Sequence, residues 1–248
     1  MNAIEDGEFR RAWVELGRRL PRPEAILCVS AHWETRGVFL TAAQAPPTIH
    51  DFYGFPAELF AVRYPAPGDP GLARRVASLL SDTGAQLDPV RGLDHGCWSV
   101  LVAMYPEADV PVVQLSLDSR QEAAFHYELA KRLRPLRDDG VLVLGSGNVV
   151  HNLRQADFGR GAGYDWAVRF DALVRAGVTA GDHAALASYA GQGAGDARLA
   201  IPTPEHYLPL LYPLALQAPA DEVRIFNDRC VLGSISMTSV VVGDSLAS

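Results

Sequence analysis

Three histidines in unlike local settings are the residues of this chain best suited to chemistry. His32 follows a short apolar run, His151 follows a Gly-Ser-Gly turn, and His206 follows the pair Pro204-Glu205. Imidazole is the commonest metal ligand and the usual general base near neutral pH. If distant parts of the chain bring these histidines together, they would form a metal site or an acid–base site.

The local setting of each histidine also allows a purely structural role. Residues just past the carboxyl ends of strands meet at one crevice in an open α/β sheet, which favours a site role for His32 and His151. A partly buried structural histidine fits each of these two positions about equally well. His206 is expected in the first turn of a helix, where the dipole disfavours imidazolium and keeps the ring able to ligate. Glu205 is an ordinary dipole partner at such a position.

The other four histidines give weaker signals. His95 lies in a loop that could simply form a turn. His50 and Asp51 belong to an aromatic loop and could serve only to order it. Structural or solvent-exposed roles are expected for His126 and His183.

The glycines around Ser146 match no common catalytic motif. A nucleophilic serine elbow requires the pattern G-x-S-x-G, and a phosphate-binding loop requires a Lys-Ser/Thr pair after its glycines. Residues 144–148 read Leu-Gly-Ser-Gly-Asn and satisfy neither pattern. We therefore expect this turn to bend the backbone sharply and to carry His151 into the crevice.

Apolar periodicity predicts the elements that must position these residues. Helices are expected at 8–20, 71–80, 97–104, 121–134, 164–176, 182–189 and 204–211, and strands at 25–29, 37–41, 110–116, 141–144, 223–226 and 235–242. Alternating strands and helices predict an α/β fold, with a mostly parallel sheet covered by helices on both faces. One catalytic domain over 1–248 is the economical interpretation. The irregular stretch 45–70, rich in proline and aromatics, is typical of a functional or lid-like loop.

Composition excludes several kinds of partner. The formal net charge is -7 without a long basic run, which argues against nucleic acid and against an anionic membrane surface. No stretch approaches the roughly 20 apolar residues of a membrane span, and the first residues do not resemble a signal peptide. The cysteines Cys28, Cys97 and Cys230 show no C-x-x-C spacing, and their sparse, odd number favours a reducing cytoplasm.

Five stretches, in order along nearly the whole chain, resemble the class III extradiol ring-cleaving dioxygenases, in the branch similar to DOPA 4,5-dioxygenase. They are Ser30-Ala31-His32-Trp33, His50-Asp51-Phe52-Tyr53-Gly54-Phe55-Pro56, Leu93-Asp94-His95-Gly96, Gly145-Ser146-Gly147-Asn148-Val149-Val150-His151-Asn152-Leu153 and Pro204-Glu205-His206-Tyr207-Leu208-Pro209-Leu210. Each is weak alone, but five in sequence are fairly specific.

The resemblance implies a reaction and a role for each histidine. The family cleaves a catechol ring next to its two hydroxyls with O₂ and non-haem Fe(II), and some members are found with zinc. By position, His32 and His206 resemble metal ligands. His151 resembles the acid–base residue and can itself ligate in a zinc-bound resting form. His95 resembles a substrate-side histidine, Glu205 is a weaker ligand candidate, and the aromatic loop would cover the substrate ring.

One departure from the family pattern leaves alternatives open. Family members usually begin with a strand ending in His-Gly-Ser-Pro, whose histidine is a ligand. This chain begins with Met1-Asn2-Ala3-Ile4-Glu5-Asp6, which resembles the segment just after that motif. We therefore expect one strand and one metal ligand to be absent. Either the start of the sequence is placed too far downstream, or the protein is a genuine variant with an altered site. A zinc-dependent hydrolase, or a non-enzymatic binding protein of the same fold, is the competing interpretation.

Overall fold

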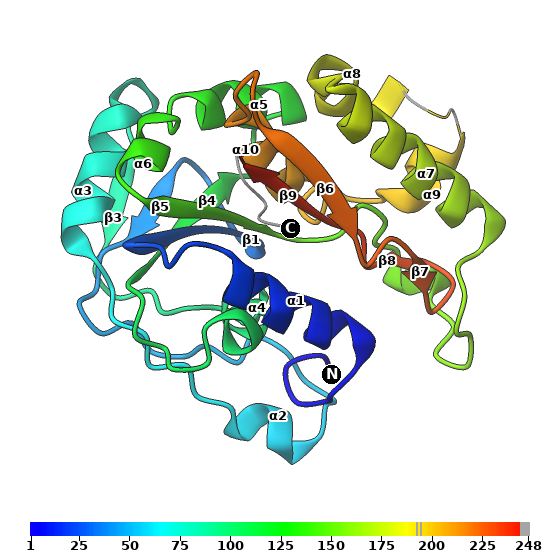
Figure 1. Cartoon of the computed structure of the whole chain (residues 1–248), viewed down its shortest axis with the longest axis horizontal. Helices are drawn as coiled ribbons and strands as arrows, with labels where there is room; N and C mark the ends of the chain where they lie inside the picture. Colours follow the sequence, from blue (N-terminus) through cyan, green and yellow to red (C-terminus); the bar gives the residue numbers. More distant parts are fainter. Residues whose placement is uncertain (192, 194, 244–248) are drawn as a thin grey trace. The chain divides into compact units, whose positions relative to one another are not determined.

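The computed structural model of the chain describes residues 1–243 except 192 and 194 (Figure 1). These residues group into two compact units. Unit 1 comprises Met1–Arg120 and Arg132–Ser146, and unit 2 comprises Gln121–Lys131 and the described residues from Gly147 onward.

Unit 1 contains a five-stranded sheet in the order β3-β2-β4-β1-β5. Its strands are β1 (Ala25–Thr35), β2 (Phe39–Thr41), β3 (Gln86–Asp88), β4 (Val112–Asp118) and β5 (Val141–Ser146). Strand β1 pairs in parallel with β4 and β5, and β2 pairs in parallel with β3. Only the bridge between Leu40 and Leu115 is antiparallel among these pairs. The sheet is therefore mostly parallel, as predicted.

Strand β1 extends further than its apolar run suggested. Ala25 to Val29 are buried, which is typical of a central parallel strand. The strand continues to Thr35, so His32 lies within β1 rather than just beyond it. The ladder with β4 shifts register between Val29 and Glu34. His32 thus belongs to the irregular part of the strand, where a bulge can redirect a side chain.

The helices of unit 1 are α1 (Glu8–Arg19), α2 (Ala57–Ala61), α3 (Pro70–Leu79), α4 (His95–Met104) and α6 (Pro135–Asp138), with a 3₁₀ turn at Ser81–Thr83. Helices α3, α4 and α6 of unit 1 pack on this sheet, and α1 packs on α4. Within the sheet, α4 contacts β1 and β5. A Cβ at Gly17 of α1 would lie 2.2 Å from the carbonyl oxygen of Met104, so this helix pair requires a glycine there. Pro135 is the first residue of α6.

Unit 2 consists of helices and two small antiparallel ribbons. Its helices are α5 (Ala123–Lys131), α7 (Asp165–Ala180), α8 (His183–Ala187), α9 (Gly195–Ala200) and α10 (Leu208–Ala215), with 3₁₀ turns at Leu153–Gln155 and Tyr189–Gly191. Its strands are β6 (Glu222–Phe226), β7 (Cys230–Val231), β8 (Ile235–Ser236) and β9 (Ser239–Gly243). Strand β6 pairs with β9, and β7 pairs with β8.

The strand predicted at 235–242 is broken into β8 and β9 by a buried carboxylate. Ser236 Oγ and Thr238 Oγ1 each donate a hydrogen bond of 2.6 Å to Asp171 Oδ1 of α7. Arg175 Nε donates to the other oxygen of Asp171 at 2.9 Å. The hydroxyls turn toward α7 because Asp171 is buried and its charge requires hydrogen-bond partners.

The predicted class, an α/β fold with a mostly parallel sheet and packed helices, is confirmed. That the catalytic domain takes in 1–248 stays a prediction. The irregular stretch 45–70 contains one short helix, α2. No helix among the described residues is both long and apolar enough to cross a membrane.

Candidate functional site

Unit 1 brings His32, Asp51 and His95 together. The possible ligand atoms of these three side chains all lie within 4.8 Å of one another. The rings of His32 and His95 lie 3.8 Å apart between centroids, at an angle of 39°. Asp51 Oδ1 lies 2.9 Å from His95 Nδ1 and accepts a 3.0 Å hydrogen bond from the backbone N–H of His95. Asp51 therefore contacts a candidate functional histidine, in addition to any role in ordering its own loop.

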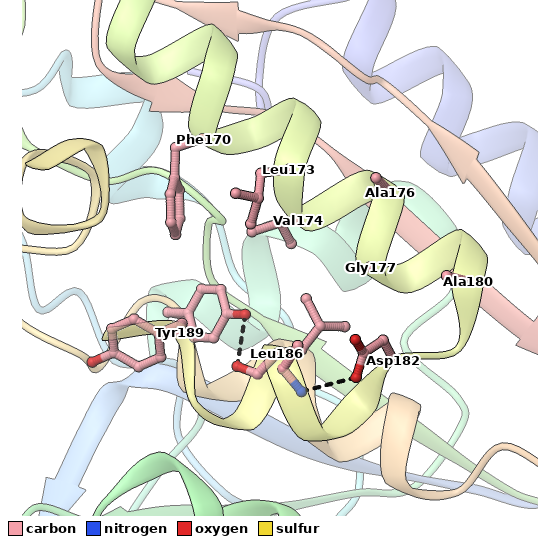
Figure 2. Close-up of a pocket in the computed structure, with 11 residues that line it drawn as sticks. Phe170, Leu173, Val174, Ala176, Gly177, Ala180, Asp182, Leu186 and Tyr189 are labelled. Atoms are coloured by element: carbon pink, nitrogen blue, oxygen red, sulfur yellow. Dashed lines mark hydrogen bonds between the residues drawn. The ribbon is translucent and has the colours of Figure 1, made fainter. Parts of the chain in front are cut away.

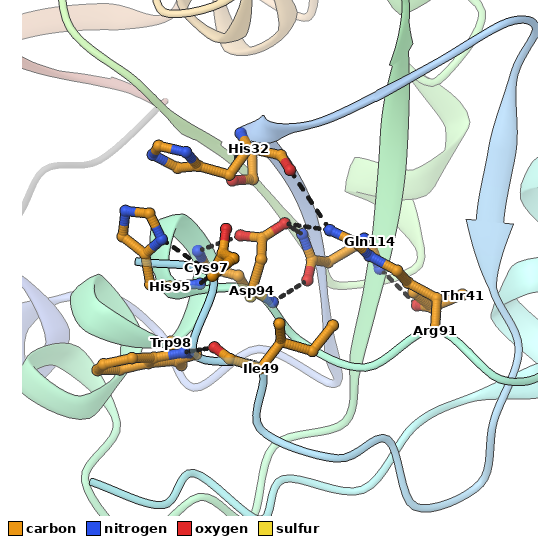
Figure 3. Close-up of polar contacts among 11 residues, drawn as sticks. His32, Thr41, Ile49, Arg91, Asp94, His95, Cys97, Trp98 and Gln114 are labelled. Carbon is orange, nitrogen blue, oxygen red and sulfur yellow. Dashed lines mark hydrogen bonds and ion pairs between the residues drawn. The ribbon is translucent and has the colours of Figure 1, made fainter. Parts of the chain in front are cut away.

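A buried pair of polar side chains fixes the start of α4, where His95 lies (Figure 3). Asp94 Oδ1 caps the helix by accepting from Cys97 N at 3.1 Å. Gln114 Nε2 donates to Asp94 Oδ2 at 2.8 Å, and Asp94 N donates to Gln114 Oε1 at 2.9 Å. Both side chains are fully buried, so their mutual satisfaction removes the cost of burying them. This pairing sets where α4 begins relative to the strands.

Gly96 lets α4 approach β1 closely. A Cβ at Gly96 would lie 2.3 Å from Ser30 Oγ and 2.9 Å from His32 Cδ2. Ser30 Oγ itself accepts a 3.2 Å hydrogen bond from the backbone N–H of His32. The Gly96 carbonyl accepts from Ser146 Oγ at 2.6 Å. A side chain at position 96 would therefore push against His32.

Burial and neighbouring charges favour neutral His32 and ionised Asp51. Burial lowers the pKa of His32, and the nearby His95 lowers it further. For Asp51, burial acts to raise the pKa, but the contacts with the ring and backbone of His95 outweigh it and lower the pKa to about 2. A neutral imidazole next to a carboxylate is suited to binding a cation.

The aromatic loop contributes one ring to this cluster. Phe52 lies with its centroid 5.3 Å from that of His95, edge to face at 84°, and it also contacts Trp98. Tyr53 is 91% exposed and Phe55 is 46% exposed. Phe52 is the loop aromatic that contacts the site histidine His95, and the covering role of the aromatic loop stays a prediction.

Unit 2 brings His151, Glu205 and His206 together. Their possible ligand atoms also lie within 4.8 Å of one another. The rings of His151 and His206 are stacked, with centroids 3.4 Å apart and planes at 9°. His206 lies in a turn before α10, which begins only at Leu208. The expectation that His206 occupies the first turn of a helix is therefore wrong, and the helix dipole does not explain its state.

Asn148 orients His206 through a chain of hydrogen bonds. Asn148 Nδ2 donates to the Ser236 carbonyl at 2.7 Å, which turns its oxygen Oδ1 toward His206. That oxygen lies 3.2 Å from His206 Nδ1. Because the amide oxygen can only accept, Nδ1 carries the proton and Nε2 carries the lone pair. This is the common arrangement behind a metal-ligating histidine.

The Gly-Ser-Gly turn serves close packing rather than a sharp bend at Gly147. The φ angle of Gly147 is not in the left-handed region. A Cβ there would lie 2.2 Å from the His206 carbonyl oxygen. That carbonyl accepts a 2.7 Å hydrogen bond from Asn148 N. Glycine is needed so that the His206 backbone can pack against this turn.

The donor atoms in both clusters fit a divalent first-row metal. Each cluster offers two imidazoles and one carboxylate, which suit iron and zinc. Each cluster is described within its own unit. The prediction that His32 and His206 ligate one ion stays a prediction.

The remaining histidines have structural contacts, as expected. His50 Nε2 lies 3.0 Å from the Val62 carbonyl oxygen and orders the aromatic loop. His126 Nδ1 lies 2.9 Å from the Tyr212 hydroxyl, and His183 Nδ1 lies 2.9 Å from the Tyr127 hydroxyl.

An apolar pocket in unit 2 gave no signal in the sequence (Figure 2). It is lined by α7, by α8 and by aromatic side chains that include Tyr189 and Tyr207. The Tyr207 hydroxyl donates to the Leu186 carbonyl at 3.0 Å, which fixes one wall. Asp182, which caps α8, is the only carboxylate among its lining residues, so the pocket lacks the donor set of the histidine clusters.

Comparison with known proteins decides the family. A family described as the catalytic LigB subunit of aromatic ring-opening dioxygenase matches residues 8–194. The chain belongs to the LigB family. It is 47% identical to the 4,5-DOPA dioxygenase extradiol of Escherichia coli K12, over 98% of this chain and 91% of that protein. It is 40% identical to the Beta vulgaris protein of the same name, over 85% of this chain and 80% of that protein.

A solved structure agrees with this assignment. The crystal structure of an uncharacterized Escherichia coli K12 protein matches with a TM-score of 0.83 and 43% identity, covering 96% of this chain and 93% of that one. The chain is an extradiol ring-cleaving dioxygenase, in the branch similar to DOPA dioxygenases. Such enzymes use a non-haem metal and act on small aromatic molecules with O₂. This finding favours the dioxygenase over the zinc hydrolase and the binding protein.

Sequence reasoning missed the side chains that orient the histidines. The sequence alone indicates no more than a loop-ordering role for Asp51, and no role for Asn148 or Gln114. Asn148 follows the Gly-Ser-Gly turn directly, which was the only available signal. Gln114 lies inside an apolar strand run, where a buried polar residue indicates a partner.

Proposed function

We propose that this LigB-family enzyme cleaves the ring of a DOPA-like catechol at the 4,5 position, with Fe(II) as the active metal. The observation that carries the proposal is the 47% identity, over 98% of the chain, to a protein named for that reaction. The two histidine clusters support it, because they supply the donors that a non-haem metal requires. Zn(II) fits the same donors and is expected to occupy the site in some preparations.

We assign His32 and His206 as metal ligands. His32 is half-buried in β1, and its lowered pKa favours the neutral ring that ligation requires. His206 is buried, and Asn148 leaves the lone pair on its Nε2. Glu205 is a weaker candidate, because its Oε1 accepts a hydrogen bond of 2.9 Å from Thr203 Oγ1. Bound ferrous iron would supply the redox centre at which catechol and O₂ react.

We assign His151 as the acid–base residue and His95 as the substrate-side residue. Ring cleavage requires a group that removes a catechol proton and returns a proton later, and imidazole does both near pH 7. His151 stacks on His206, which keeps it beside the proposed ligand. It is also an additional ligand candidate in a zinc-bound resting form. His95 lies against His32 and would hydrogen-bond the substrate.

A cytoplasmic location is part of the proposal. Cys28, Cys97 and Cys230 are free thiols, all buried. Burial raises the pKa of Cys230 to about 12, so this thiol stays protonated at neutral pH. Free thiols are the usual state in a reducing compartment.

The test is reconstitution followed by a substrate assay. Purified chain is loaded with Fe(II) without oxygen, mixed with L-DOPA, and exposed to O₂ while absorbance and oxygen uptake are followed. We expect a yellow ring-opened product and one O₂ consumed per DOPA. His151→Ala should keep its metal content and lose ring cleavage. No oxygen uptake by the iron-loaded wild type would contradict the substrate assignment, and full activity in His151→Ala would remove its acid–base role.

A further inference from the structure

A chain of hydrogen bonds within unit 2 links the buried carboxylate of Asp171 to His206. We propose that Asp171 is a positioning residue for the metal site, which acts on His206 through Ser236 and Asn148. This inference rests on the ligand role proposed above for His206. It extends the site to helix α7, which carries none of the site residues assigned so far.

Asp171 is a fixed acceptor, because three donors surround its carboxylate. The residue lies on α7 and is only 1% exposed. Its Oδ1 accepts from Ser236 Oγ and Thr238 Oγ1, each at 2.6 Å, and its Oδ2 accepts from Arg175 Nε at 2.9 Å. Hydrogen bonds to a carboxylate are shorter and stronger than neutral ones. Burial of the carboxylate would be costly without these partners, so the two hydroxyls are held firmly against α7.

Ser236 is held at its amide, at its side chain and at its carbonyl. Its backbone N–H donates to the Val150 carbonyl at 2.9 Å. Its hydroxyl donates its only proton to Asp171, and the same oxygen accepts from the backbone N–H of Thr238 at 3.1 Å. Its carbonyl accepts from Asn148 Nδ2 at 2.7 Å. Because a residue has only two soft backbone dihedrals, the anchors on the Ser236 amide and hydroxyl leave its carbonyl little freedom to turn.

The Ser236 carbonyl selects the orientation of the Asn148 amide. An amide side chain has donors on its nitrogen and an acceptor on its oxygen. With Nδ2 bound to the carbonyl, Oδ1 lies 3.2 Å from His206 Nδ1. A flipped amide would place its oxygen against the carbonyl, where two acceptors repel each other. The backbone N–H of Asn148 donates to the His206 carbonyl at 2.7 Å, so the two residues stay adjacent and only the amide orientation depends on Ser236.

Asp171 therefore contributes to metal affinity without contacting a metal ligand. The partner of the second ring nitrogen fixes the orientation of a ligating histidine. Here that partner is Asn148, and its own orientation depends on a carbonyl that α7 holds in place through Asp171. Without this support the Ser236 carbonyl could turn, the Asn148 amide could rotate, and the His206 ring would be less preorganised. The alternative is a purely structural role, in which Asp171 only ties α7 to residues 236–238.

The two hydroxyls on one oxygen of Asp171 offer a matched pair of variants. Ser236→Ala and Thr238→Val each remove a 2.6 Å hydrogen bond to Asp171 Oδ1, but only residue 236 carries the carbonyl that binds Asn148. Zn(II) affinity is measured by competition with a chromophoric chelator, and thermal unfolding of the metal-free chains shows that both variants fold. Zn(II) affinity should fall about tenfold in Ser236→Ala, the lower end of the range for residues behind a metal ligand, and stay within about twofold in Thr238→Val. Equal affinities in the two variants would refute positioning through Ser236 and leave Asp171 a purely structural role.

A second measurement reads the Asn148 amide without metal or substrate. Its side-chain NH₂ signals in ¹H–¹⁵N spectra, assigned by their absence in Asn148→Asp, report the hydrogen bond to the Ser236 carbonyl. We expect these signals to shift in Ser236→Ala and to keep their wild-type positions in Thr238→Val. Asp171→Asn keeps an oxygen that can accept from Ser236, so its Zn(II) affinity should lie closer to wild type than that of Ser236→Ala. Unchanged Asn148 signals in Ser236→Ala would overturn the proposal.

His206→Ala separates this role of Asp171 from the proposed function. Its Zn(II) affinity should fall further than that of Ser236→Ala, because it removes the ligand itself. An unchanged affinity in His206→Ala would show that His206 is not a ligand, and both proposals would fail. A loss in His206→Ala without any loss in Ser236→Ala would refute the role of Asp171 alone. Neither measurement requires ring cleavage, so both stand apart from the L-DOPA assay.

Discussion

At the scale of single residues, the side chain of Asn148 decides which nitrogen of His206 is available to a ligand. Asp51 contacts His95 Nδ1 and Asn148 contacts His206 Nδ1. The hydrogen-bonded nitrogen of His206 is Nδ1, so Nε2 is the nitrogen left for a ligand. The chemistry of His206 therefore depends on a neighbour that carries out no chemistry itself.

Asn148→Ala should weaken metal binding about 10- to 100-fold, because the partner that fixes the His206 tautomer is lost. The measurement is an anaerobic titration of the purified chain with Fe(II) or Zn(II). Ala also removes the 2.7 Å bond to the Ser236 carbonyl, so thermal unfolding of the metal-free protein should be recorded in parallel. Unchanged metal affinity in a folded variant would show that Asn148 does not orient a ligand.

The candidate histidines could be predicted from sequence, but their partners could not. His32, His151 and His206 could be predicted because each lies in a stretch that resembles the dioxygenase family. Asp51 lies 44 positions before His95, and Ser236 lies 88 positions after Asn148. No local pattern links such distant residues, because their contacts arise only from tertiary packing.

At the scale of elements, the start of α4 is the most constrained junction of unit 1. Asp94 and Gln114 fix it from the strand side, and Gly96 allows it to lie against Ser30 and His32. Helix α4 therefore positions His95 and limits the space around His32 at once.

Gly96→Ala should disturb this junction, because its Cβ would meet Ser30 Oγ and His32 Cδ2 well inside van der Waals contact. Overpacking of this kind costs about 1–3 kcal/mol of unfolding free energy, and His32 should be displaced enough to reduce ring cleavage. Denaturant unfolding and the oxygen-uptake assay measure the two effects. Gly161→Ala, where nothing lies within 4 Å, is the control. Equal unfolding free energy and equal oxygen uptake in Gly96→Ala and Gly161→Ala would mean that the start of α4 shifts to accommodate the added methyl group at little cost.

The end of β4 should give a pH-dependent contribution to stability. Hydrogen bonds from Arg120 lower the pKa of Asp118 to about 2. Because this is below the unfolded value near 3.9, the stabilisation is fully present above about pH 4 and is lost as the pH falls through about 2. Asp118→Asn should therefore lower the free energy of unfolding by about 1–2 kcal/mol at pH 6 and by almost nothing near pH 2.

Denaturant unfolding at several pH values checks the Asp118 prediction. Asp6→Asn serves as the control, because the Asp6 side chain is 77% exposed and its ion pair with Arg11 is 3.5 Å long. A destabilisation by Asp118→Asn that is the same at pH 2 and pH 6 would assign the effect to packing rather than to charge.

Element types could be predicted well, while boundaries near the site could not. The apolar run at 25–29 predicted a strand, but hydrogen bonding carries β1 through the polar residues to Thr35. The stretch 204–211 predicted a helix from Pro204, but α10 begins at Leu208. In both places the departure lies at a site histidine, where tertiary contacts outweigh local propensity.

At the scale of the whole molecule, the number of bound metal ions distinguishes one shared site from two separate sites. Both units offer a cluster of two histidines and a carboxylate. The family resemblance predicts a single ion with His32 and His206 among its ligands. Two independent ions are the alternative that the donor sets allow.

Metal-dependent unfolding distinguishes one shared ion from two independent ions. An ion that binds only the folded state stabilises it by about 2.7 kcal/mol at 100 times Kd, which raises the unfolding temperature. With one shared ion, His32→Ala and His206→Ala should each remove most of the Zn(II)-induced shift, and metal analysis should give one ion per wild-type chain. Two ions per chain, with each substitution removing only one, would contradict the shared site.

The contacts of Ser236 determine how far this protein can be shortened from its C-terminal side. Its hydroxyl donates a hydrogen bond to Asp171 of α7. Its carbonyl accepts a hydrogen bond from Asn148 Nδ2, and the Oδ1 of the same amide faces His206. The family match ends at residue 194. A fragment cut at that point would still contain the whole family match, yet it would lose Glu205, His206 and the support of Asn148. Expression fragments of this enzyme should therefore extend through β9.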